Sequence, residues 1–165
     1  MRRHFTATGF VVREGRTLLH WHKRLQHWMP PGGHIEPDED PVTAVLREIR
    51  EETGLVAEVI PLAPTMPIDY PGQLPAPYTI LVENSPELGS PHQHIDFIYF
   101  CRPLDGPPPD PLPDPTVRWV DEATLRSNRP LELAEGNLFA PVPTDVRLLA
   151  LIAIETGRQA LGSRF

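Results

Sequence analysis

The chain has 165 residues and a formal net charge of −7. This length allows one domain with a substantial core, and the acidic balance argues against a DNA-binding protein, which usually carries a basic surface. The acidity does not exclude a small phosphorylated substrate held through a metal ion.

Cysteine content and hydropathy indicate the cellular compartment in which the protein is expected. Cys101 is the only cysteine, so no intrachain disulfide can form, and its apolar neighbours predict a buried thiol rather than a catalytic one. No long apolar run of a secretion signal follows Met1-Arg2-Arg3, and no segment is long enough to span a membrane. A cytoplasmic protein without membrane contact is the default expectation.

Two strands are predicted at the start of the chain. Residues 4–12 are rich in β-branched and aromatic side chains, and residues 17–23 alternate as their hairpin partner beyond Arg13-Glu14-Gly15. The segment Pro30-Pro31-Gly32-Gly33 predicts a tight turn, where glycine lets a backbone carbonyl approach a ligand closely.

Side chains around this turn are candidate substrate contacts: Arg24, Trp28 and His34. Trp28 would either stack on a base or pack in the core. Four histidines precede the next element: His20, His22, His27 and His34. Their spacing matches no zinc motif, so structural or substrate-contact roles are favoured over zinc ligation.

A helix is predicted between Asp40 and Gly54. Asp40 is a suitable N-cap, Pro41 fits the first helical position, and Gly54 fits the left-handed position that ends a helix. One face of this helix is apolar at helical spacing and comprises Val42, Val45, Leu46 and Ile49.

Three carboxylates, Glu48, Glu51 and Glu52, border that apolar face at spacing i, i+3 and i+4. Because their like charges repel one another, a hard divalent cation such as Mg²⁺ would stabilise them. The alternative is a solvated acidic face with Arg47 and Arg50 as ion-pair partners.

The chain beyond the helix predicts a strand over residues 56–62 and another over residues 79–83. A proline-rich loop, residues 61–77, lies between them. The aromatic side chains of Tyr70 and Tyr78 either cover a substrate or hold this loop to the body of the protein.

Residues 95–101 form the most strand-like run of the chain. His94 and Asp96 point to the same side of this strand because its side chains alternate with period two. Both are candidate substrate contacts.

The last third of the chain begins with a second proline-rich loop, residues 103–115. A strand over residues 116–120 follows, and Asp121 begins a short helix. The final helix is expected over residues 144–156, with Gly157 as its stop. Its predicted buried face comprises Val146, Leu149, Ile152 and Ala153.

This order of elements indicates an α/β fold, with a mixed sheet and helices on both of its faces. Both proline-rich segments are interpreted as loops within one domain that spans residues 1–165, because neither remainder would form a core alone.

Residues 33–55 carry many fixed residue types at fixed spacing. Gly33, five residues, Glu39, seven residues and then REIREETGL match the pattern G-x5-E-x7-RE-U-x-EE-x-G-U. Here the chain resembles the Nudix hydrolase family. The resemblance implies an α/β/α sandwich and hydrolysis of a nucleoside diphosphate linked to another moiety.

The resemblance also implies roles for individual residues. The expected ligands of Mg²⁺ or Mn²⁺ are the carbonyl of Gly32 and the side chains of Glu48, Glu51 and Glu52. The candidate catalytic residues are Glu48, Glu52 and Arg47. Gly33, Glu39 and Gly54 are expected to shape the motif, with Glu39 paired to Arg47.

The identity of the general base stays open between Glu48, the first candidate, and an acid from a later loop. The loop candidates are Asp114, Glu132 and Glu135.

The predicted activity is metal-dependent hydrolysis of a pyrophosphate bond in a small nucleotide-type substrate. The resemblance adds a homodimer as an expectation. An alternative is a nucleotide-sensing or protein-binding module on the same scaffold, but such modules commonly lose the motif carboxylates, which are all present here. An isoprenoid diphosphate isomerase is disfavoured because it needs a catalytic cysteine, and Cys101 lies far from the motif.

Overall fold

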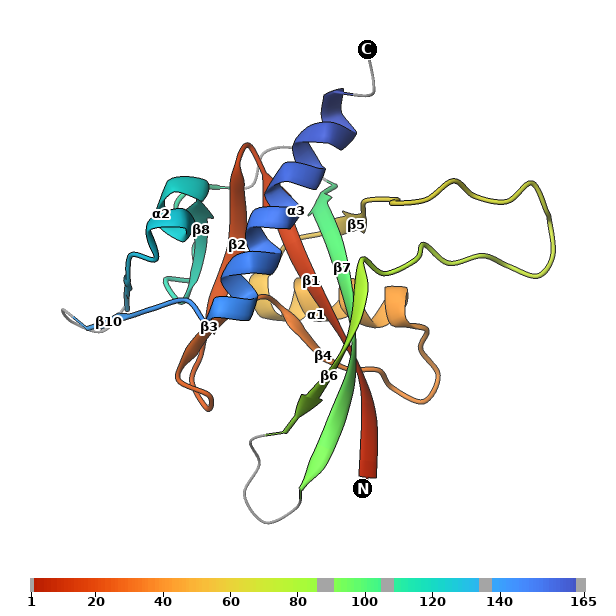
Figure 1. The fold of residues 1–165 in the computed structure, drawn as a ribbon, viewed down its shortest axis with the longest axis horizontal. Coiled ribbons are helices and arrows are strands. Elements are labelled where there is room, and N and C mark those ends of the chain that lie inside the picture. The colour runs from red at the N-terminus through yellow and green to blue at the C-terminus, as the bar shows by residue number, and fades with distance from the viewer. Residues whose placement is uncertain (1, 86–90, 105–108, 134–137, 163–165) are drawn as a thin grey trace.

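The computed structural model describes residues 2–85, 91–104, 109–133 and 138–162. The elements follow one another as β1 (Arg2–Arg13), β2 (Arg16–His22), β3 (His27–Met29), β4 (Gly32–His34), α1 (Pro41–Thr53), β5 (Ala57–Val59), β6 (Thr79–Asn84), β7 (His92–Pro103), β8 (Val117–Asp121), α2 (Glu122–Ser127), β9 (Leu131–Glu132), β10 (Phe139–Ala140) and α3 (Thr144–Gly162). Figure 1 shows the long strands β1 and β7 side by side at the centre of the molecule.

The main sheet is mixed. Its central pair, β1 and β7, is parallel, and the strand order is β3-β2-β1-β7-β5. β8 pairs with β2, β6 pairs with β7, and β4 pairs with β1. β1 pairs with β2 only at Val12 and Arg13, and towards its beginning it takes β4 as its antiparallel neighbour instead. β2 and β4 therefore follow each other along the same edge of β1.

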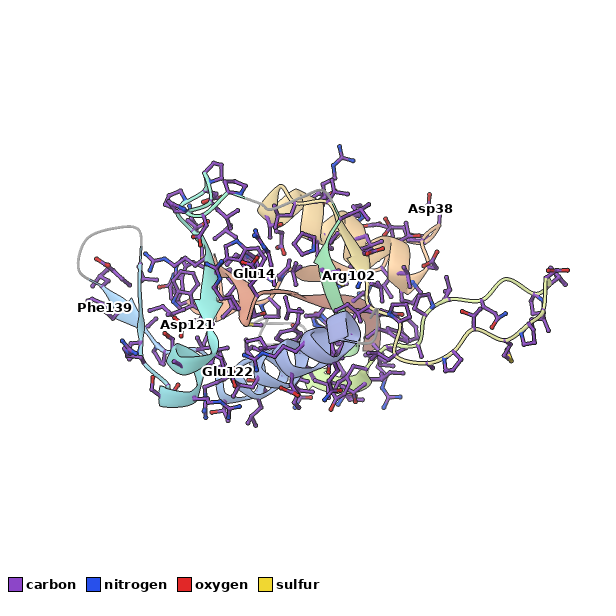
Figure 2. The ribbon with its side chains drawn as sticks, turned by 90° about the horizontal axis from the view of Figure 1, so that it is seen from above. Glu14, Asp38, Arg102, Asp121, Glu122 and Phe139 are labelled. Atoms are coloured by element: carbon purple, nitrogen blue, oxygen red, sulfur yellow. The ribbon has the colours of Figure 1, made fainter. Side chains whose placement is uncertain are left out.

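Side chains of β1 alternate between two cores. Phe10 and Val12 pack in the core that contains residues of α3, whereas Ala7 and Val11 pack in the core that contains residues of α1. Figure 2 shows α1 and α3 on opposite sides of the sheet. The predicted α/β/α sandwich is confirmed.

The local signals at the β1–β2 turn and at the ends of α1 are confirmed. Glu14 and Gly15 both have positive φ, 49° and 74°, as a two-residue hairpin turn of the right twist requires. Asp40 accepts hydrogen bonds from the N–H groups of Val42 and Thr43, and Gly54 ends α1 with φ of 74°.

α3 is longer than predicted, because Gly157 lies inside it and does not end it. A Cβ built on Gly157 would lie 2.7 Å from Cγ2 of Val12, so glycine there allows α3 to pack closely on β1. The assignment of Ile152 to the buried face is wrong, since that side chain is 39% exposed. Ala150 and Ile154 are buried instead.

Three short segments also differ from expectation. The strand predicted over residues 56–62 is limited to β5. It ends before Pro61, because this proline and those beyond it have no N–H group to donate to a neighbouring strand. The turn predicted over residues 30–33 does not include Gly32 and Gly33. These two residues belong to β4 and pair with β1. β3 was not predicted; it pairs with β2.

The prediction that Cys101 is a buried thiol is confirmed. The thiol is fully buried, and this burial raises its pKa. Within the four described ranges, no helix combines the length and the apolar character needed to cross a membrane.

The segment between β5 and β6 projects away from the sheet as a long loop in both views (Figures 1 and 2). It contains most of the first proline-rich segment. In the second proline-rich segment, residues 105–108 lie outside the described residues, and Leu112 is buried against the core on the α1 side.

Candidate functional site

Two carboxylates of α1 reach the backbone of β4. A Cβ built on Gly33 would lie 2.3 Å from Oε1 of Glu48, so Glu48 occupies the space that any larger residue at position 33 would need. The N–H of Gly32 donates to Oε2 of Glu52 at 2.9 Å. Glu48 and Glu52, one helical turn apart, therefore meet at the same two glycines.

Glu52 lies between β4 and β2, where its Oε2 is 3.4 Å from Nε2 of His20. The pKa of Glu52 is raised to about 7, mainly by burial. The charges of Glu48 and Glu51 add to the increase, and the Gly32 N–H opposes it. Burial lowers the pKa of His20 to about 4, so its imidazole is neutral near pH 7 and does not compensate the carboxylates.

Arg47 ties these carboxylates to the loop before α1. Its Nε and Nη2 donate to the two carboxylate oxygens of Glu39, at 2.7 and 2.9 Å. Its Nη1 donates to Glu48 at 2.7 Å and to Glu51 at 3.2 Å, and Nη2 also donates to the carbonyl of His34. The predicted pair of Glu39 and Arg47 is present, and Arg47 also orients two α1 carboxylates.

The oxygen atoms around Gly32 fit a hard divalent cation. The N–H of Gly9 donates to the carbonyl of Pro31, so Gly32 occupies the next, non-hydrogen-bonded position of the β1–β4 pair. The N–H and carbonyl of Gly32 therefore point away from β1, to the side of Glu52. Carboxylates and a backbone carbonyl are ligands that Mg²⁺ and Mn²⁺ accept, and the raised pKa of Glu52 means that a cation would stabilise the ionised cluster.

We expect Arg47→Lys to weaken binding of Mg²⁺ to this cluster about tenfold, as loss of a group that orients metal ligands typically does. Lysine keeps the charge but cannot hold Glu39, Glu48 and Glu51 at once, because it lacks the planar fork of donors. Titration of turnover with Mg²⁺ measures the change. Arg50→Lys, an exposed site on α1, is the matched control, and equal Mg²⁺ dependence in both variants would contradict the orienting role.

A cavity of about 310 Å³ adjoins the carboxylate cluster, which is the size of a small-ligand site. Gly32, Gly33 and His20 line it, whereas the three α1 carboxylates lie beyond these residues and do not line it. Other parts of the wall come from β1, β6, β7 and the start of α3. The cavity thus occupies the α3 face of the sheet, and Gly32 and Gly33 of β4 stand between it and the α1 carboxylates.

Three further carboxylates line this cavity: Glu83, Asp96 and Asp145. Asp96 is 5% exposed and accepts hydrogen bonds from Oγ1 of Thr6 at 2.9 Å and Oγ1 of Thr8 at 2.8 Å. Burial raises the pKa of Asp96, and these two hydrogen bonds oppose the shift. The pKa of Glu83 is raised by desolvation and then by the charges of Asp96 and Asp145. This wall can accept hydrogen bonds from N–H and O–H groups of a ligand.

Sequence reasoning identified Asp96 but missed Glu83 and Asp145. Glu83 belongs to the site because it pairs with His94 across β6 and β7, and a sequence does not reveal which residues of two strands stand opposite each other. Asp145 could have been found as an acidic residue in the first turn of α3.

Four of the predicted substrate contacts line the cavity: Arg24, His34, His94 and Asp96. Trp28 does not, because its side chain is fully buried and meets Trp21 edge to face, with ring centroids 5.5 Å apart. Core packing, the alternative considered for Trp28, is confirmed.

Tyr70 and Tyr78 do not line the cavity either. Tyr70 is 89% exposed in the projecting loop. The ring of Tyr78 stacks on Phe100 with centroids 4.5 Å apart, which supports a role in holding the loop to the body of the protein.

Tyr78→Ala is expected to lower the free energy of unfolding by about 1 kcal/mol, the typical contribution of an aromatic pair, without changing KM. Tyr70→Ala, made in the same loop, should change neither quantity. Chemical denaturation and steady-state kinetics measure the two effects, and a higher KM in either variant would restore the substrate-covering role.

The two described loop candidates for the general base do not line the cavity, although Asp114 lies close enough to the cavity residue His20 for their charges to interact. Asp114 accepts hydrogen bonds from the backbone N–H and the hydroxyl of Thr116, and Glu132 is exposed on β9. Glu135 lies outside the described residues. Neither described candidate lines the cavity. Glu48 and Glu52 do not line it either, but they meet at Gly32 and Gly33, which do, so this geometry favours a carboxylate of α1.

Comparison with known proteins gives a family match over most of the chain. The family model described as the NUDIX domain matches residues 2–140. A solved structure described as a hydrolase of the NUDIX family from Clostridium perfringens is 25% identical in sequence with a TM-score of 0.67, and the match covers 94% of this chain and 98% of that one.

Curated relatives match shorter stretches. The asymmetrical bis(5'-nucleosyl)-tetraphosphatase of Mus musculus is 48% identical over 40 residues, which are 24% of this chain and 27% of that protein. A probable DHNTP pyrophosphohydrolase of Lactococcus lactis is 30% identical over 98 residues, 59% of this chain and 52% of that protein. The match thus spans about a quarter to a half of the length of these two relatives.

Proposed function

The chain belongs to the NUDIX domain family, and from this premise we propose that it is a metal-dependent hydrolase of a pyrophosphate bond. Its proposed substrate is a small nucleotide-type molecule in which a nucleoside diphosphate is linked to another moiety. The relatives named as a tetraphosphatase and a pyrophosphohydrolase support this substrate class.

The observation that carries the proposal is the meeting of Glu48 and Glu52 at Gly32 and Gly33, beside the cavity. We propose that the nucleoside part of the substrate occupies the cavity and that its phosphates extend along β4 towards α1. The acidic wall around Asp96 suits the N–H and O–H donors of a base or sugar better than it suits phosphate, because like charges repel.

Glu48, Glu51, Glu52 and the carbonyl of Gly32 are the proposed ligands of Mg²⁺ or Mn²⁺. Such a cation neutralises phosphate oxygens and lowers the pKa of a bound water molecule. Arg47 holds Glu48 and Glu51 in position, and the neutral His20 limits the freedom of Glu52.

The proposed general base remains Glu48, the first candidate from the sequence. A base must lie within hydrogen-bond reach of the attacking water, and Glu48 contacts Gly33, which lines the cavity. Arg47 donates to Oε1 of Glu48, which fixes the carboxylate while its second oxygen can accept a proton.

The activity is tested by a hydrolysis screen with the purified protein. The panel comprises nucleoside triphosphates, oxidised nucleotides, ADP-ribose, nucleotide sugars, diadenosine polyphosphates and NADH, each with Mg²⁺, with Mn²⁺ and with EDTA. Release of phosphate products from one class, lost with EDTA, is the expected result. A folded protein that binds a nucleotide without cleaving any member would favour the sensing or protein-binding module.

Several finer features belong to the same proposal. We propose a single domain over the whole chain, a cytoplasmic location, no binding of DNA, and a homodimer. Sedimentation of the purified protein with and without substrate tests the last of these, and a monomer at all concentrations would contradict it.

A further inference from the structure

Four of the seven histidines gather at one end of the sheet: His4, His34, His92 and His94. The ring centroids of His4 and His92 are 4.6 Å apart, and those of His92 and His94 are 5.0 Å apart. We call His4, His92 and His94 the histidine cluster. It is separate from the carboxylates of α1, and the proposed function assigns it no metal ion.

Strand pairing builds the histidine cluster. His4 of β1 stands opposite His94 of β7 in the parallel register, and His92 stands two residues earlier on the same face of β7. Two paired strands therefore fix all three backbone positions. Sites on regular elements hold their side chains more precisely than sites on loops.

The nitrogen atoms of the cluster are close enough to share one ion. One ring nitrogen from each of His4, His92 and His94 can be chosen so that all three lie within 4.8 Å of one another, and Nε2 of His92 is 3.2 Å from Nε2 of His94. Nitrogen ligands about 2.0–2.1 Å from a tetrahedral zinc ion are about 3.3–3.4 Å apart. Small rotations of the imidazole rings would bring the three nitrogens to that spacing.

The surroundings are favourable to a cation. Glu83 stands opposite His94 across β6 and β7, and the buried Asp96 follows on the same face of β7. Three nearby positive residues, Arg2 and Arg3 at the start of β1 and Arg24 on the cavity wall, are exposed, where solvent and salt screen their charges.

We propose that His4, His92 and His94 bind one transition-metal ion of the Zn²⁺ type, at a second metal site. Imidazole nitrogen suits zinc, nickel and copper ions, whereas Mg²⁺ and Mn²⁺ prefer oxygen. Three protein ligands leave a fourth position open. His94 and the neighbouring His34 also line the cavity, so the open position can take water or a neutral polar group of a cavity ligand.

The test is a Zn²⁺ titration of the full-length protein, freed of metal with a chelator and kept in excess Mg²⁺ to occupy the α1 carboxylates. Calorimetry measures affinity and stoichiometry, and the visible absorption of added Co²⁺ reports the ligand geometry. The variants are His4→Gln and His94→Gln. The matched control is His27→Gln, an exposed histidine of β3 outside the cluster.

The expected result is one Zn²⁺ per chain that persists in His27→Gln and in Glu51→Gln, with affinity at least about 100-fold lower in His4→Gln and His94→Gln. Zn²⁺ should raise the melting temperature of the wild-type protein and should not raise that of the two cluster variants. His4 and His94 are both only partly buried and lie on different strands, so either variant keeps the test valid if the other fails to fold.

The proposal is overturned if the folded wild-type protein binds no Zn²⁺, or if Zn²⁺ affinity is the same in the cluster variants and the control. Loss of Zn²⁺ binding in Glu51→Gln, with retention in His4→Gln, would overturn it as well, because the ion would then occupy the carboxylate cluster. None of these measurements depends on hydrolysis, so the test of the zinc site is independent of the substrate screen that tests the proposed function.

Discussion

Replacing Glu52 by Gln should lower kcat/KM for the preferred substrate about 10³-fold, because losing one of the proposed metal-binding carboxylates would remove about 4 kcal/mol of transition-state stabilisation. The fold should survive. The glutamine side chain keeps an oxygen that can accept a hydrogen bond from the N–H of Gly32. It also replaces a partly buried carboxyl group whose pKa is raised to about 7.

Steady-state kinetics of the Glu52→Gln variant with Mg²⁺ and with Mn²⁺ measure this loss, and thermal denaturation checks the fold. Glu36→Gln is the matched control, since Glu36 is exposed in the loop before α1 and has the same chemistry. A folded Glu52→Gln variant with the activity of the control would refute the assignment of Glu52 as a metal ligand.

Gly33→Ala should lower kcat/KM about 100-fold, the typical effect of moving a catalytic group by about 1 Å, if Glu48 has the role proposed for it. The new Cβ would lie 2.3 Å from Oε1 and 2.6 Å from Cδ of Glu48, so the carboxylate must move. Because the ladder between β4 and β1 involves only backbone atoms, the strand pairing can persist.

Gly72→Ala provides the control for a glycine substitution, since nothing lies within 4 Å of a Cβ built there. Kinetics and denaturation of both variants separate the effect on the site from that on stability. Gly33→Ala with normal kinetics would mean that the position of Glu48 next to β4 is not needed for turnover.

The sequence was sufficient for α1 and for the fold class because their signals are local. Asp40, Pro41 and Gly54 act within one turn of their own positions, and the alternation of apolar side chains in β1 does not depend on its neighbours. Gly157 shows where local reasoning fails. Its residue type predicts the end of a helix, yet it lies inside α3, where glycine allows close packing against Val12.

The cavity could not be predicted as well from the sequence, because its wall depends on which residues of neighbouring strands stand opposite each other. Thr6 and Asp96 are 90 residues apart in the chain and share a hydrogen bond only because β1 and β7 pair in parallel at that position. The histidine cluster has the same origin: His92 and His94 are two residues apart in the chain, but only the pairing of β1 with β7 brings His4 to them. The motif carboxylates, by contrast, come from one helix, and their neighbourhood could be predicted from helical geometry.

The parallel pairing of β1 with β7 also determines when this protein can fold during its synthesis. The ribosome releases β1, β2 and the whole of α1 well before β7, so an emerging chain holds every motif carboxylate while the central strand of its sheet has no parallel partner. Such distant pairing is slow to form, and unpaired strand edges promote aggregation. The nascent first half would therefore depend on the arrival of residues 92–103 before it could complete either core.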